Sequence, residues 1–171
     1  MNRTAIWIFA ASLTCCGLQA QSTSLVTEMK ASYNGVKNNL IKAAEKMPED
    51  AYSYKPADTI RPFGALIAHV AGQARTCGAV KGGEQKAIDT SKTSKADLLA
   101  ALKESFAVCD AAWDAMNDTT AMETIAGRGG AQRTKIGSLI GSTIVHNNEM
   151  YGTISVYMRV KGLVPPSSEG R

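Results

Sequence analysis

The stretch HNNEMYGTISVYMRVKGLVPP, residues 146–166, completes the last and longest run of helical periodicity in the chain. Gly162 stands where a helix end is expected, and Pro165-Pro166 cannot continue a helix. Upstream, inward-facing positions recur at steps of three and four: Ile136, Leu139, Thr143, His146, Met150, Thr153 or Ile154, and Tyr157. The pattern predicts one long helix from about Thr134 to Lys161.

The first half of the chain predicts two further helices. The first runs from Leu25 to Met47 with one apolar face and stops before Pro48. The second starts near Pro62, because proline is well suited to the first turn of a helix, where its missing N–H is not needed. Three glycines, Gly78, Gly82 and Gly83, close this second helix.

A third helix is expected from Ser94 to Met116, since Ser94 and Asp97 resemble a capping box. Residues 117–133 are rich in Asp, Thr and Gly and predict a long loop with one short turn at most. No segment has the alternating pattern of a convincing strand. Four amphipathic helices without strands bury their apolar faces most simply as an all-α four-helix bundle.

The N-terminus has the pattern of an export signal. A charge-free apolar stretch from Ala5 to Cys16 follows a short positive segment, and small residues precede a cleavage site after Ala20. We therefore expect residues 1–20 to be a signal peptide and residues 21–171 to form the domain, in the periplasm or outside the cell, with no transmembrane span. The alternatives are an uncleaved anchor, a helix of the fold, or a lipoprotein modified at Cys16.

Export changes the interpretation of the four cysteines. Cys15 and Cys16 fall in the leader, which leaves Cys77 and Cys109 in an oxidising compartment. A disulfide between these two is favoured, and it requires Cα atoms within about 7 Å of each other. Two buried, unlinked thiols are the alternative.

The composition is that of an ordinary globular domain, with 44% apolar and 20% charged residues. The net charge of +4 comes from basic residues that are scattered rather than clustered. We therefore expect no nucleic-acid partner. The sequence indicates neither a small-molecule ligand nor an oligomeric state, so a homodimer stays open.

Histidine is rare, and both copies, His69 and His146, lie in predicted helices among apolar neighbours. A buried imidazole needs a hydrogen-bond partner or a metal ion. Each one alone is more simply a hydrogen-bonded core histidine. Two on different helices favour a shared metal site, because bundle cores assemble such sites from facing helices.

Residues 61–71 (RPFGALIAHVA), together with residues 146–152 (HNNEMYG) and 156–166, resemble the DinB-like (YfiT-like) superfamily of four-helix-bundle proteins interpreted as metalloenzymes. The resemblance extends from about residue 25 to 168. It implies a divalent metal ion, often nickel or zinc, held by one histidine of the second helix and a His-x-x-x-His pair of the last. His69 and His146 match two of these positions, and the third is Met150.

A methionine at the third position weakens the implied site. The thioether is a soft donor that suits copper(I) better than zinc or nickel. We therefore expect an exported protein with a degenerate His69, His146 and Met150 site in the bundle core, non-catalytic or weakly metal-binding. The alternative is a metal-dependent hydrolase or thiol S-transferase that uses the two histidines. Neither Glu149 as a ligand nor Asn147 and Gln73 as supports is favoured by the sequence.

Overall fold

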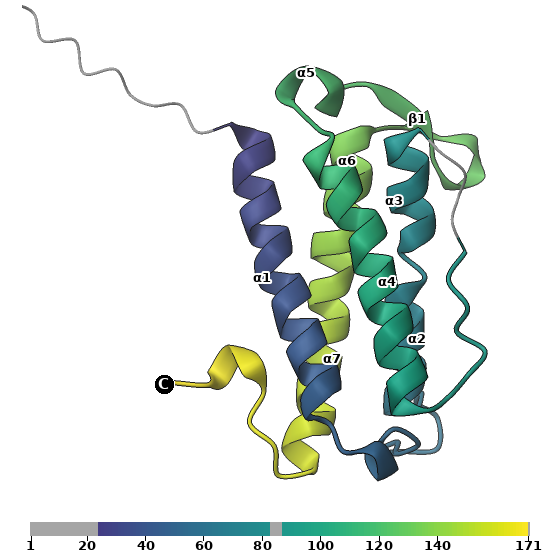
Figure 1. The fold of residues 1–171 in the computed structure, drawn as a ribbon, viewed down its shortest axis with the longest axis vertical. Coiled ribbons are helices and arrows are strands. Elements are labelled where there is room, and N and C mark those ends of the chain that lie inside the picture. Colours follow the sequence, from purple (N-terminus) through teal and green to yellow (C-terminus); the bar gives the residue numbers. More distant parts are fainter. Residues whose placement is uncertain (1–23, 83–86, 171) are drawn as a thin grey trace, which may run out of the picture.

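The first helix of the bundle, α1 (Leu25–Lys46), buries one side along its whole length. A computed structural model describes residues 24–82 and 87–170 of the chain, and Figure 1 shows how its helices pack side by side. The predicted signal peptide, residues 1–20, lies outside the described residues. The all-α four-helix bundle expected from the sequence is confirmed.

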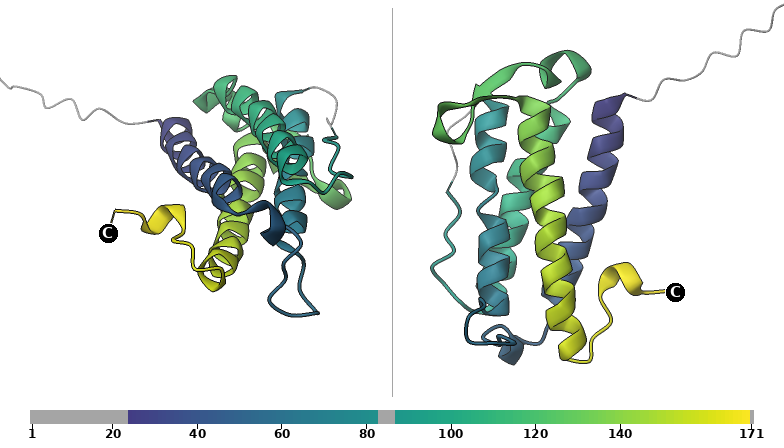
Figure 2. Two further views of the ribbon diagram at one scale, coloured as in Figure 1. Left: turned by 60° about the horizontal axis from the view of Figure 1, so that its bottom comes forward. Right: turned by 180° about the vertical axis from the view of Figure 1, so that it is seen from behind.

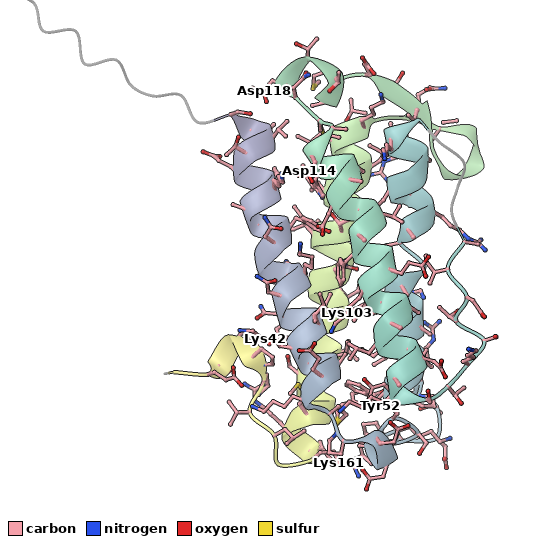
Figure 3. All side chains as sticks on the ribbon, viewed as in Figure 1. Lys42, Tyr52, Lys103, Asp114, Asp118 and Lys161 are labelled. Carbon is pink, nitrogen blue, oxygen red and sulfur yellow. A yellow bond between two sulfur atoms is a disulfide. The ribbon has the colours of Figure 1, made fainter. Side chains whose placement is uncertain are left out.

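Helix α1 is held against α4 (Lys95–Asp114) by apolar packing and by pairs of charges along the contact. Lys37 Nζ lies 2.8 Å from Asp110 Oδ1, and Lys103 Nζ lies 2.7 Å from Glu45 Oε1. Lys103 is labelled on α4 in Figure 3. Ion pairs this exposed contribute little stability each, so apolar burial holds the two helices together.

The second helix of the bundle is interrupted and forms two pieces, α2 (Phe63–Ala71) and α3 (Ala74–Lys81). A short turn at Glu49–Ala51 precedes α2. Between the pieces, backbone hydrogen bonds join residues three apart, as from Gly72 N to His69 O and from Gln73 N to Val70 O. Gly82, at φ +84°, ends α3 in the left-handed conformation that glycine adopts without strain.

Helix α4 begins as the sequence predicts, because the Ser94 hydroxyl accepts a hydrogen bond from the Asp97 backbone N–H at 3.1 Å. It runs parallel to α2 and α3, since Gly64 approaches Leu98 at one end and Cys77 meets Cys109 at the other. Residues 87–94 contain no helix and run beside the bundle to the start of α4, as Figure 2 shows.

The connection between α4 and the last helix contains a hairpin, so the prediction of a strandless loop is wrong here. A short helix, α5 (Asp118–Ala121), is followed by the antiparallel strands β1 (Thr124–Ala126) and β2 (Gln132–Thr134), with a turn at Arg128–Gly130 between them. Strands of three residues are too short to show an alternating pattern in the sequence.

The last helix of the bundle begins as α6 (Lys135–Leu139), continues as a π-helical segment over Ile140–Val145, and ends as α7 (His146–Val160). Trp113 of α4 is buried against the π-helical segment, where its Nε1 donates to Thr143 Oγ1 at 3.3 Å. The ring also stacks on Tyr33 of α1 at 5.7 Å between centroids. Three bundle helices therefore meet at this tryptophan. After α7 the chain turns at Gly162, and a short turn at Pro166–Ser168 follows.

The helices of the described part of the chain are too short or too polar to cross a membrane. Within the bundle, Cys77 of α3 and Cys109 of α4 are joined at a disulfide S–S distance of 2.01 Å, with Cα atoms 4.9 Å apart. The geometry supports the pairing favoured by the sequence. Both cysteines are fully buried.

Removing this bond should destabilise the bundle. The bond links residues 32 apart in sequence, and closing a loop of that length restricts the unfolded chain by roughly 3–4 kcal/mol. We expect the variant with both Cys77→Ala and Cys109→Ala to lose at least that much free energy of unfolding, measured by urea titration. Each single variant should lose nearly as much as the double variant. A single variant as stable as the wild type would show that the bond does not form.

Candidate functional site

The two histidines meet across the second and last bundle helices. His69 lies in the last turn of α2 and His146 is the first residue of α7. Their Nε2 atoms are 3.1 Å apart, and the ring centroids are separated by 5.0 Å with the planes tilted by 66°. Two ring nitrogens at this distance cannot both carry a hydrogen, so at least one presents a lone pair to the other or to a shared ion.

The pair lies at the surface of the bundle, so the expectation that it meets in the core is wrong. The His69 side chain is exposed, and those of His146 and Met150 are half-buried. The inward positions are occupied instead by the next residue along: Asn147 is fully buried and Tyr151 nearly so.

The π-helical segment explains this shift. A π-helical turn holds more residues than an α-helical turn, so the residues after it are displaced around the helix by about one position. The buried series that begins with Leu139 and Thr143 therefore continues as Asn147, Tyr151, Ile154 and Met158. Regular α-helical spacing places His146 and Met150 there instead, and no feature of the sequence reveals the additional residue.

Immediately inside the histidines, two amides form a buried hydrogen bond. Asn147 Nδ2 donates to Gln73 Oε1 at 2.5 Å, and both side chains are at least nine-tenths buried. Asn147 Oδ1 also lies 3.4 Å from His146 Nδ1. Polar groups thus form a continuous chain from His69 at the surface to Gln73 in the interior. Neither amide was favoured as a support from the sequence alone, because polar residues beside a candidate ligand are common.

His69 lines an open cavity of about 480 Å³. It is lined by Arg61, His69 and Thr90, by Ala65 and Ala68 of α2, and by Gly72, which follows α2. A second cavity of about 700 Å³, toward Tyr52 and Ser94, shares Ala65, Ala68 and Thr90 with the first. The two cavities therefore adjoin along the outer face of α2, and His69 lies at the edge of the first one.

The surroundings of His69 favour its neutral form. Partial burial is the largest cause of a lowered pKa, followed by the neighbouring His146 and by Arg61, while the carboxylate of Glu149 acts in the opposite direction. Glu149 therefore lies close enough to His69 to influence its charge. It is three residues after His146, a spacing that places both on one face of α7.

The donor atoms fit a metal ion in part. Two nitrogens bound to one zinc ion at about 2.0–2.1 Å are separated by roughly 3.3 Å in tetrahedral geometry, which is close to the distance between the two Nε2 atoms. Within residues 24–82 and 87–170, however, no group of three or more His, Cys, Asp or Glu side chains is arranged to hold a metal ion. The geometry thus provides two ligands.

Comparisons with known proteins agree with the architecture. The DinB superfamily profile matches residues 33–154. The chain also resembles the crystal structure of a DinB-like protein from Bacillus cereus ATCC 10987, with a TM-score of 0.67 and 18% identity over 81% of this chain and 93% of that one. At this identity the likeness shows the fold alone. No curated protein matches the chain.

In the metal-free protein, we expect His69 to titrate with a pKa below the ordinary value of 6.5. Changing His146→Ala should raise this pKa, because it removes a neighbouring charge that disfavours protonation. Changing Glu149→Gln should lower it further. NMR titration of the ring protons measures the His69 pKa in the wild type and in both variants. A His69 pKa above 6.5 in the wild type would contradict this account of the site.

The same shift has a consequence for stability. Between the lowered pKa and 6.5 the unfolded chain binds more protons at residue 69 than the folded one. Stability from this group is therefore fully present above pH 6.5 and decreases as the pH falls through this window. Chemical unfolding at several pH values measures the free energy of unfolding, with His69→Gln as the control that cannot titrate at residue 69. The stability of the wild type relative to this variant should decrease as the pH falls below 6.5.

Proposed function

Because this chain belongs to the DinB superfamily, we propose that it binds a divalent metal ion, zinc or nickel, weakly through His69 and His146 and does not act as an enzyme. The observation that carries the proposal is the 3.1 Å separation of the two Nε2 atoms. Two side chains from different helices face each other at a distance that suits two ligands of one ion.

Weak binding of the metal ion follows from the residue at the third ligand position. Met150 stands where the family resemblance implies a third imidazole, and its half-buried side chain lies at the edge of the core. A thioether is a poor ligand for zinc or nickel, although it suits copper(I), which is the minor alternative. Two imidazoles leave several positions of the ion to water, so the ion dissociates readily.

A metal-dependent hydrolase or thiol S-transferase is the second candidate, and the cavity beside His69 favours it. A bound divalent ion would lower the pKa of a water molecule or thiol and make it a nucleophile at neutral pH. The cavity of about 480 Å³ that His69 lines would give a small substrate access to that position. Weak retention of the ion is the argument against this candidate.

We also propose that the protein is exported to the periplasm or beyond. Disulfides persist mainly in oxidising compartments, and the Cys77–Cys109 pair is at bonding distance. The N-terminal sequence supports the same location, since an apolar stretch ends in small residues at Ala20.

Metal binding is tested by calorimetric titration of zinc and nickel into the purified protein. The wild type should bind one ion weakly, and His69→Ala and His146→Ala should each abolish binding. Met150→His supplies a third imidazole on the same helix and should increase affinity at least tenfold.

Met150→Leu is the matched control, because it keeps the size of the side chain and removes the sulfur. It should bind zinc as the wild type does if the thioether contributes nothing. The proposal is wrong if Met150→His binds no better than the wild type. Tight wild-type binding together with hydrolase or thiol-transfer activity would favour the enzyme instead.

Export is tested on the full chain expressed in a bacterial host with fractionation of the cells. The mature protein should be found outside the cytoplasm and should begin with Gln21, as read by mass spectrometry of its N-terminal peptide. Replacing Ala20 with a bulky residue should slow the cleavage. A cytoplasmic protein that keeps residues 1–20 would refute this part of the proposal.

A further inference from the structure

We propose that the buried amide pair, Asn147 and Gln73, is a positioning device that holds the proton of His146 on Nδ1 and turns the Nε2 lone pair toward His69. The link from this device to metal binding rests on the proposed function, whereas the position of the proton does not.

The direction of the hydrogen bonds carries the argument. Asn147 uses Nδ2 to donate to Gln73 Oε1 at 2.5 Å, so the atom it turns toward His146 is Oδ1. An amide oxygen accepts hydrogen bonds and cannot donate them. The facing atom of His146, Nδ1, must then carry the hydrogen. A neutral imidazole has one N–H, so Nε2 is left with its lone pair.

Burial keeps this arrangement from reversing. Rotating the Asn147 amide alone would separate its Nδ2 from Gln73 Oε1 and bring two oxygens together. Both amides must therefore rotate together, inside a core where Asn147 is 0% and Gln73 6% exposed. The orientation of the pair and the tautomer of His146 are thus set as one unit.

The pair is not arranged for stability alone. Gln73 Nε2 is buried and has no hydrogen-bond partner among the described residues, and leaving a buried donor unpaired is unfavourable. Gln73 also occupies the interruption between α2 and α3, four residues after His69, while Asn147 follows the π-helical segment. The interruption of the second bundle helix and the π-helical segment of the last one therefore both lie beside this amide pair.

The consequence for the site is preorganisation. With His146 fixed, the Nε2 of His69 donates across the 3.1 Å gap in the metal-free protein. Only His69 must move its proton for both lone pairs to face one ion. Hydrogen bonds to the second nitrogen of a ligating imidazole commonly contribute tenfold or more to metal affinity.

The test is NMR of the uniformly ¹⁵N-labelled, metal-free protein at pH 8, where correlations between ring nitrogens and carbon-bound protons identify the protonated nitrogen. The wild type should show His146 protonated on Nδ1. Asn147→Leu should move the proton to Nε2, because the acceptor is gone. Asn147→Asp should keep it on Nδ1, because a carboxylate accepts the same hydrogen bond. Asn148→Ala, at the exposed neighbouring position, is the matched control and should change nothing.

A wild-type His146 protonated on Nε2 overturns the proposal, and this result does not require any variant to fold. An Asn147→Leu variant that stays folded and keeps the proton on Nδ1 also overturns it. Zinc titration then tests the link to the site: affinity should fall about tenfold in Asn147→Leu and be retained in Asn147→Asp. Expected tautomers in a wild type that binds no zinc would refute the proposed function and leave the positioning role intact.

Discussion

The packing of Trp113 against the last bundle helix is the contact from which the rest of the structure follows. The ring is buried between Tyr33 of α1 and the π-helical segment, and its N–H is bonded to Thr143. Thr143 in turn donates to the carbonyl of Leu139 one turn earlier. A buried indole N–H usually finds a hydrogen-bond partner, and this contact restrains the rotation of the last helix about its own axis. Every residue after Thr143 inherits that rotation.

That rotation decides what kind of site the histidines form. With Asn147 and Tyr151 turned inward, His146 lies near the surface beside His69, and His69 lines the cavity along α2. A metal ion bound by such a pair at the surface would exchange its remaining ligands with solvent, and small molecules would reach it without any opening of the bundle. The same pair in the core would be shielded and would depend on a complete set of ligands to offset the cost of burial. A weak, accessible site is therefore consistent with the packing.

The parallel arrangement of α2–α3 and α4 places a second constraint on the site. The disulfide at Cys77 and Cys109 joins these helices near one end, and Gly64 allows their close approach near the other. Gln73 lies one turn before Cys77, so the covalent link holds the interrupted helix close to the point where it meets α7. The amide pair and the disulfide thus restrain the same segment from two sides, which keeps His69 at its distance from His146.

The sequence alone determined the four helices, their ends at Pro48, Ser94 and Gly162, and the all-α class. It also determined the family, through the segments that contain the two histidines. These features depend on neighbouring residues: apolar spacing, caps and prolines act within one or two turns of the chain. The tertiary structure decided the hairpin at Thr124–Thr134, the interruption at Gly72, and the exposure of the histidine pair. Regular α-helical spacing through residue 146 was expected from the sequence, whereas the structure has a π-helical turn, and Trp113 of another helix packs against it. The buried face of a helix depends on the helices packed against it, and a local sequence pattern carries no information about those partners.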